Sequence, residues 1–403
     1  MKKKVVILIT ILVLCFTCLF IYERVHGISI LLNMKLNGSD TTINLGEEYT
    51  DEGVSAKYMN KDLDVTTSND IDNTKVGSYS YIYKVTYKKV SKEIKRTITV
   101  LDNIKPTITL NGRNNLSIVK GGVYNEMGAS ATDNYDGDIT DITISGEVNT
   151  NEVGTYEIIY TAKDSSNNEA SITRTINVVD SKAIKIPILN YHFFYEDSSE
   201  PCHENLCVNT AKFREQLNYL KENGYYTLTM KEFTDWMYGN IELPNKSVLI
   251  TVDDGAWGTG KNNGNHLIRL LEEYDMYGTL FLITGFWDKE NYQSPNLDVE
   301  SHTNNLHHEQ RCGHRSMVNC VPYETVLNDL KETINILGTK EAFCFPFYEA
   351  TDTSVQAVKD AGFKVSFAGK GGNVTRNTDK YRIPRYAVHD STTMEQFIKM
   401  VEV

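Results

Sequence analysis

Two neighbouring acids and a later group of histidines are the residues of this chain best suited to bind a metal. Asp253 and Asp254 are followed by Gly255, which allows a sharp turn. Further along, the run ESHTNNLHH contains His302 and His307. Two imidazoles and one carboxylate leave positions open for water, a set that suits Zn²⁺ or another first-row divalent ion. These residues predict a metal site with room for water.

The spacing of the two histidines limits the segment that can carry such a site. His302 and His307 are five positions apart, so on a helix they would lie about 140° apart. They can converge on one ion only from a loop or turn, as expected after a strand at 297–299. Each group also has a simpler interpretation: the histidine run fits a polar surface loop, and Asp-Asp-Gly fits a helix cap or a solvated turn.

The elements around these residues alternate between strands and helices. Continuous apolar runs at 248–252 and 280–283 are typical of strands buried on both faces of a parallel sheet. Helical spacing occurs at 213–220, 267–274, 326–337 and 355–361, before Gly224, Gly278, Gly338 and Gly362. We expect an α/β domain over 183–403, a distorted β/α barrel, with its reactive groups at the carboxyl ends of the strands.

Three motifs in this region resemble a known family. TVDDG at 251–255, SHTNNLH at 301–307 and FPFY at 345–348 resemble the first three motifs of the NodB-homology, or carbohydrate esterase 4, polysaccharide deacetylases. The resemblance covers most of 185–400. The histidine motif is one residue longer than the commonest form, as in the branch similar to poly-N-acetylglucosamine deacetylases. That branch also has an early Tyr-His pair, here Tyr191-His192.

The resemblance implies a role for each motif residue. Asp254, His302 and His307 would hold the metal, with Zn first and Co, Ni or Mn as alternatives. Asp253 would be the general base and His192 the general acid. A bound metal acidifies water and polarises an amide oxygen, which suits hydrolysis of an acetamide.

Two positions depart from the family pattern. The third motif usually begins with arginine, but this chain has Cys344 there, so the residue that orients the base is absent from its usual place. Arg385 is a candidate substitute, although an arginine beside Pro384 also fits a surface ion pair. His389 lies near the last motif of many relatives and is a second candidate for the acid.

Several aromatic residues near the motifs are candidates for substrate contacts. A backbone N–H near Phe347 would help to hold the oxyanion. Trp257, Tyr348, Phe286 and Trp287 could stack on sugar rings, with core packing as the alternative, above all for Phe286.

The cysteines indicate an oxidising compartment. Cys202 and Cys207 bracket one polar loop, and Cys312 and Cys320 bracket another. Four cysteines could bind zinc, but these spacings are looser than a zinc knuckle, so two local disulfides are expected.

The N-terminus is typical of a membrane segment. Lysines at 2–4 precede an uncharged apolar run over 5–22, which is just long enough to cross a bilayer. We expect an uncleaved single-pass anchor over 1–27, with the rest of the chain outside the cell membrane. A cleaved signal peptide is the alternative.

Residues 28–102 and 103–180 are two copies of one small domain. Leu36-Asn37-Gly38 recurs at 110–112, and Arg96-Thr97-Ile98 recurs at 174–176. Their short β-branched and aromatic runs predict β-sandwiches, and the modules resemble bacterial immunoglobulin-like modules of surface proteins. Asp133, Asp136 and Asp138 could form a calcium loop, but their spacing does not continue into an EF-hand, so a solvated turn is expected.

The net charge of −12 disfavours nucleic acid as a partner. The expected function is a metal-dependent N-deacetylase acting on the N-acetylglucosamine of cell-wall peptidoglycan. The alternatives are deacetylation of poly-N-acetylglucosamine in a biofilm matrix and an inactive surface protein that binds glycan. The expected partners are an N-acetylated glycan polymer and the membrane; protein partners are not predicted.

Overall fold

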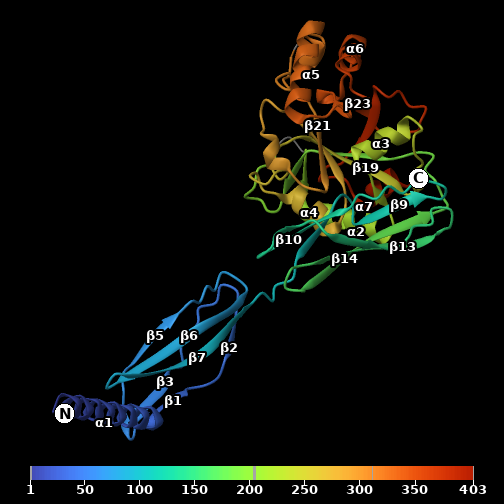
Figure 1. The fold of residues 1–403 in the computed structure, drawn as a ribbon. Helices are drawn as coiled ribbons and strands as arrows, with labels where there is room; N and C mark the ends of the chain where they lie inside the picture. The colour runs from blue at the N-terminus through green and yellow to red at the C-terminus, as the bar shows by residue number, and fades with distance from the viewer. Residues whose placement is uncertain (1, 203–205, 311, 403) are drawn as a thin grey trace. The chain divides into compact units, whose positions relative to one another are not determined.

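The chain divides into two compact units. The computed structural model describes residues 2–202, 206–310 and 312–402, and Figure 1 shows the order of the elements. Unit 1 comprises residues 1–108, 130–142 and 161–170, and unit 2 comprises 109–129, 143–160 and 171–403.

Unit 1 begins with an apolar helix, α1 (Lys2–Leu31). Its segment Ile9–Leu31 is long and apolar enough to cross a membrane. Large apolar side chains such as Phe16 and Phe20 are exposed on it. The helix continues past residue 27, where the sequence predicted the anchor to end.

The first immunoglobulin-like region has two sheets. The first contains β1 (Leu32–Leu36), β3 (Val54–Tyr58) and β4 (Lys61–Asp62) in the order β1-β3-β4. The second contains β2 (Thr41–Asn44), β5 (Val65–Asn69), β6 (Gly77–Tyr87) and β7 (Val90–Leu101) in the order β2-β7-β6-β5. Alternate residues of these strands are buried, among them Leu32, Val85 and Ile98.

The second immunoglobulin-like region repeats this pattern of sheets. One sheet contains β8 (Thr107–Leu110), β10 (Ala129–Asp133) and β11 (Gly137–Ile139) in the order β11-β10-β8. The other contains β9 (Asn115–Val119), β12 (Ile142–Ser145), β13 (Gly154–Lys163) and β14 (Glu169–Val179) in the order β12-β13-β14-β9.

A buried arginine marks the repeat in each copy. Arg96 forms a salt bridge with Asp51 and also bonds the carbonyl oxygens of residues 37 and 53. Arg174 pairs with Glu126 and bonds the carbonyl oxygens of residues 111 and 128. The predicted internal repeat is therefore a structural repeat as well.

The C-terminal part of unit 2 is a parallel barrel. Its eight-stranded sheet has the order β15-β24-β23-β22-β21-β20-β19-β18. An additional parallel pairing of β15 with β19 closes the sheet. The strands are β15 (Ile188–Tyr191), β18 (Tyr226–Thr227), β19 (Ser247–Asp254), β20 (Gly278–Leu282), β21 (Leu297–Ser301), β22 (Ala342–Cys344), β23 (Val365–Lys370) and β24 (Ile383–Ala387). The predicted distorted β/α barrel is confirmed.

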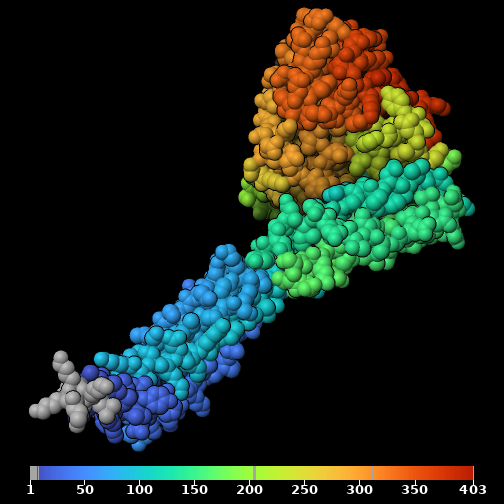
Figure 2. Space-filling model, viewed as in Figure 1, coloured from blue at the N-terminus to red at the C-terminus, as the bar shows by residue number. Residues whose placement is uncertain are grey.

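Helices lie between most of the barrel strands, largely where the sequence predicted them, and one helix follows the last strand. They are α2 (Thr210–Glu222), α3 (Met230–Met237), α4 (His266–Tyr274), α5 (Tyr323–Leu337), α6 (Asp352–Ala361) and α7 (Met394–Val401). The helices α5 and α6 pack side by side, and their orange and red surface forms one end of unit 2 in the space-filling view (Figures 1 and 2). Gly278 does not end α4 as expected. Asp275 does so in a left-handed conformation, and Gly278 begins β20.

Within unit 2, the sheet that contains β9 contacts the barrel domain through a buried arginine. Arg113 forms a salt bridge of 2.6 Å with Glu232 and donates a hydrogen bond to the carbonyl oxygen of Thr227. Its guanidinium lies 3.7 Å from the ring centre of Tyr277 and 4.5 Å from that of Tyr226. This contact joins segments that the sequence analysis treated as separate domains.

Candidate metal and active site

The two adjacent acids lie at the carboxyl end of β19. Their side chains point in different directions because of the backbone conformation of Asp254. The sequence placed the strand at 248–252, before both acids. In the structure, β19 continues through both acids and pairs with β20 as far as Asp254, opposite Leu282. Asp254 has a φ of 78°, a left-handed conformation that is rare for a residue with a side chain. This local strain turns Asp254 away from the alternation of the strand.

Asp254, His302 and His307 converge as one candidate ligand set. Asp254 Oδ1 lies 3.3 Å from His302 Nε2 and 3.2 Å from His307 Nε2. The three ligand atoms lie within 4.8 Å of one another. His302 follows β21 directly, and His307 lies in the loop beyond it, so the histidines converge from a loop rather than from a helix.

The surroundings of this set suit a divalent ion. His302 Nδ1 lies 2.8 Å from the carbonyl oxygen of Cys344, which directs Nε2 toward Asp254. Burial opposes ionisation of Asp254, but hydrogen bonds from His302 and His307 outweigh it and hold the pKa of Asp254 well below its usual value. One carboxylate and two imidazoles with aligned nitrogens fit Zn²⁺ chemistry.

Arg385 holds the first acid, Asp253. Arg385 Nη1 is 2.7 Å from Asp253 Oδ1, and Nη2 is 2.6 Å from Oδ2. Arg385 comes from β24, while Cys344, whose Sγ lies 2.9 Å from Arg385 Nη2, occupies the family's arginine position. Burial disfavours the charged form of Asp253, but the charge and hydrogen bonds of Arg385 outweigh it and lower its pKa. Asp253 is therefore an oriented carboxylate.

Asn190 also contacts this pair, and the sequence analysis missed it. Its Nδ2 donates to Tyr348 Oη at 2.7 Å and to Asp253 Oδ2 at 3.3 Å. Its Oδ1 accepts a hydrogen bond from Arg385 Nη1 at 3.0 Å. The available signal was a single amide within the apolar strand β15, directly before Tyr191-His192. A polar side chain buried at the carboxyl end of a barrel strand is a mark of a site residue.

The two candidate acids have different surroundings. His192 Nε2 lies 3.8 Å from Asp253 Oδ2, and the side chain is buried. Burial lowers the pKa of His192 and outweighs the opposite effects of Asp254 and Asp253. The backbone N–H of His389 donates to Thr392 Oγ1, and burial followed by the charge of Lys370 lowers the pKa of the His389 ring. The structure thus brings His192 to the first acid.

The predicted aromatic residues differ in backbone conformation and in burial. Phe347 and Tyr348 have successive left-handed backbones, with φ of 60° and 62°, and the Phe347 ring lies 5.0 Å from that of His307. Trp257 is partly buried, and its indole nitrogen has no hydrogen-bond partner among the residues that the structure describes. Phe286 and Trp287 are 47% and 37% exposed, which leaves apolar faces open to a sugar ring.

The loops that follow β16 (Phe193–Tyr195) and the histidine motif carry disulfides. Cys202 is bonded to Cys207, and Cys312 is bonded to Cys320. Cys344 is free and buried. Both bonds match the pairing expected from the sequence.

Family models match both the N-terminal and the C-terminal parts of the chain. Residues 240–366 match the polysaccharide deacetylase family, and residues 34–100 and 108–178 match the Ig-like domain of bacterial surface proteins. The chain therefore carries two regions that match the bacterial immunoglobulin-like domain, followed by a region that matches the polysaccharide deacetylase domain.

Named relatives include two staphylococcal enzymes. The poly-beta-1,6-N-acetyl-D-glucosamine N-deacetylase of Staphylococcus aureus is 27% identical over 232 residues, covering 52% of this chain and 76% of the relative. The enzyme of that name from Staphylococcus epidermidis is 27% identical over 216 residues, covering 49% and 72%. The solved structure of the Streptococcus pyogenes deacetylase PplD in complex with acetate is 21% identical, with a TM-score of 0.47 over 55% of this chain and 100% of that chain.

Proposed function

We propose that this protein is a metal-dependent N-deacetylase of polymers that contain N-acetylglucosamine. The observation that carries the proposal is the convergence of Asp254, His302 and His307 beside Asp253, whose carboxylate Arg385 holds in place. Asp254, His302 and His307 would hold the ion, Zn²⁺ by first choice. A divalent ion acidifies water and polarises the amide oxygen.

Two side chains of this protein carry out the proton transfers. Asp253 is ionised and oriented by Arg385, so it accepts the proton of the attacking water. His192, within 3.8 Å of Asp253, supplies a proton to the leaving amine. A backbone N–H near Phe347 helps to stabilise the oxyanion. His389 is the rival acid.

Two polymers are candidate substrates, and different observations favour them. The similarity to the staphylococcal enzymes favours poly-β-1,6-N-acetylglucosamine. The apolar helix and the bacterial surface domains favour peptidoglycan, because they would anchor the catalytic domain near the wall. We propose the first polymer as the better substrate and peptidoglycan as the second.

The same features support a cell-surface location. We infer that residues 1–27, which include most of α1, are a single-pass anchor, that 28–102 and 103–180 are modules of a stalk, and that 183–403 is the catalytic domain outside the membrane. The disulfides support an oxidising compartment. An inactive glycan-binding protein is disfavoured because the ligand set, the base and a candidate acid are all present.

Acetate release tests this proposal. The full chain in detergent is loaded with Zn²⁺ or Co²⁺ and incubated with each polymer, beside Asp253→Asn, His192→Ala and His389→Ala variants. We expect release that needs metal and Asp253 and that falls with His192→Ala but not with His389→Ala. No release from either polymer by a metal-loaded protein contradicts the deacetylase and supports the binding protein.

A further inference from the structure

We propose that Asp102, Asp133 and Asp164 form a calcium site in unit 1, separate from the catalytic centre. Their ligand oxygens lie within 4.8 Å of one another. Asp102 follows β7, Asp133 is the last residue of β10, and Asp164 follows β13. The sequence analysis considered only a local loop through Asp133, whereas these acids come from three segments.

Two carboxylate oxygens of the cluster are buried without a partner. Asp102 is 4% exposed and Asp164 is 7% exposed. In the part of the chain that the structure describes, Asp102 Oδ2 and Asp133 Oδ2 are buried and accept no hydrogen bond. Burying an ionised carboxylate is unfavourable unless an opposite charge or hydrogen bonds compensate for it. A bound cation would supply that compensation.

The hydrogen bonds that these carboxylates do accept come from neutral groups. Asp102 Oδ1 accepts one from the backbone N–H of Ile104, and Asp133 Oδ1 accepts two from the backbone of the next turn. Asp164 accepts one from the backbone N–H of Asn168 and one from its amide. These contacts orient the acids without cancelling their charge.

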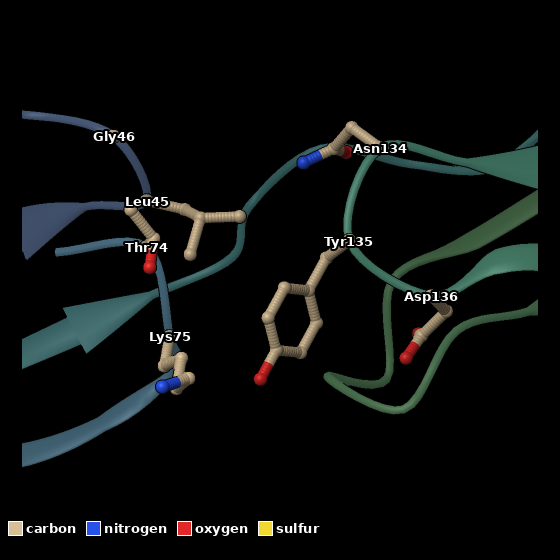
Figure 3. A pocket seen from close by; sticks show the side chains of 7 residues that line it. All are labelled: Leu45, Gly46, Thr74, Lys75, Asn134, Tyr135 and Asp136. Carbon is tan, nitrogen blue, oxygen red and sulfur yellow. The ribbon is translucent and has the colours of Figure 1, made fainter. Parts of the chain in front are cut away.

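The loop after Asp133 lies beside a pocket that is distinct from the cluster. The pocket is lined by Leu45, Gly46, Thr74, Lys75, Asn134, Tyr135 and Asp136 (Figure 3). Lys75, the cation of this pocket, pairs with Asp72 at 2.8 Å. Asp136 accepts hydrogen bonds from the backbone N–H and hydroxyl of Ser165. The acids of the turn therefore have separate structural roles.

The first immunoglobulin-like region shows that the fold does not require acids here. Ala56 and Ala131 occupy equivalent positions in the two copies, and both are 4% exposed. Two residues further on, Tyr58 at the end of β3 is therefore equivalent to Asp133 at the end of β10. Val85 and Ala162 are likewise buried at equivalent positions, so Tyr87 in the first copy is equivalent to Asp164 in the second. The Tyr58 and Tyr87 rings stack with centres 4.5 Å apart. One copy thus has an apolar contact where the other has two carboxylates, which points to a ligand.

The chemistry of the set favours Ca²⁺ over other ions. All three side chains offer carboxylate oxygens. Hard cations such as Ca²⁺ prefer oxygen ligands, whereas many first-row transition metals favour nitrogen or sulfur ligands. Ca²⁺ binds oxygens at about 2.3–2.6 Å, so oxygens on opposite sides of the ion can be about 5 Å apart, which accommodates the cluster. Mg²⁺ needs shorter distances and retains several waters. Bound Ca²⁺ would tie the connection after β7 to the ends of β10 and β13.

Calcium titration of the full chain in detergent, first stripped with EDTA, tests the site. We expect calorimetry to show binding with a Kd of about 10⁻⁴ to 10⁻³ M, the range of extracellular calcium modules. Asp102→Asn and Asp164→Asn should weaken binding at least about tenfold, since ligand charge sets affinity. Asp138→Asn, which removes a charge from the neighbouring strand β11, is the matched control and should bind like the wild type. Asp254→Asn should keep this binding, because it alters only the catalytic site.

Thermal melting separates a ligand role from a structural one. In EDTA, Asp102→Asn and Asp164→Asn should melt no lower than the wild type, because each removes repulsion between carboxylates. Added Ca²⁺ should raise the melting temperature of the wild type and of Asp138→Asn but not of these two variants. Absence of calcium binding by the wild type overturns the proposal, as does binding that Asp254→Asn abolishes and Asp102→Asn retains.

Discussion

Arg385 and Asp253 form a two-point ion pair in the barrel, although one lies on β24 and the other on β19. Arg385 Nη1 donates to Asp253 Oδ1 at 2.7 Å, and Nη2 donates to Oδ2 at 2.6 Å. Both side chains are buried. Cys344 is small and lies against the guanidinium, so Arg385 reaches the carboxylate from a different strand than in the usual family pattern. The pair keeps Asp253 ionised and fixes its direction.

Arg385→Lys should impair turnover more than binding. Lysine keeps the charge but cannot make two parallel hydrogen bonds to the carboxylate, so Asp253 loses its fixed direction. We expect kcat to fall about 10–100-fold with little change in KM or bound metal. Steady-state kinetics and metal analysis check this. Arg382→Lys, at a half-buried arginine that lies away from the site and is paired with the exposed Asp352, is the control and should be neutral.

Cys344→Ala should retain most of the activity. The hydrogen bond that orients His302 is accepted by the backbone carbonyl oxygen of residue 344, and an alanine at this position has the same carbonyl. Burial raises the pKa of the Cys344 thiol, so the sulfur is not a reactive thiolate. We expect acetate release within about threefold of the wild type. A complete loss of activity in a folded, metal-loaded variant would assign the sulfur a role in catalysis.

His307→Ala should weaken metal binding while its neighbour does not. His307 Nε2 contacts Asp254, whereas the exposed His308 ring lies 5.5 Å from that of Phe286. Losing one of the three proposed ligands should reduce Zn²⁺ affinity at least about tenfold and abolish activity. Competition with a zinc dye measures the affinity. Equal losses in His307→Ala and His308→Ala would argue against this ligand set.

Arg113→Leu should destabilise unit 2. It removes the buried partner of an ion pair and leaves the partly buried Glu232 with hydrogen bonds from Tyr226 and Thr229, so the cost should be at most about 3–5 kcal/mol. Calorimetry should show a lower melting temperature for the transition of unit 2. Lys182→Ala is the control: its pair with Glu242 at 3.5 Å is exposed, so about 0.5 kcal/mol or less is expected. A result for Arg113→Leu as small as the control would show that the contact contributes little.

Glu300→Gln should change how stability depends on pH. Burial raises the pKa of Glu300 from 4.5 to about 8, so between these values the folded chain keeps a proton that the unfolded chain has lost. The stability contributed by this group is present at low pH and declines by about 1.4 kcal/mol per pH unit as the pH rises to about 8. The glutamine variant should lack this decline. Melting curves in EDTA from pH 5 to 8 check it, with Glu332→Gln, at an exposed position of α5, as the control.

Local sequence patterns predicted most of the barrel elements. The apolar run at 248–252 and the helical spacing at 326–337 correspond to β19 and α5, because burial on two faces or on one stripe leaves a recognisable pattern in the sequence. The Asp-Asp-Gly turn and the histidine spacing likewise indicated a loop-borne ligand set. The direction of Asp254 was not predictable, because it depends on one left-handed residue within a paired strand.

The sequence by itself determined which residues could do chemistry, where the strands and helices would form, and that one module is repeated. Only the tertiary structure decided their partners: Arg385 and Asn190 on Asp253, Arg113 on Glu232, and Asp102 beside Asp133 and Asp164. Periodicity reports which face of a segment is buried, but not which distant segment covers it. Strand order and register set those partners, and they arise from the packing of the whole domain.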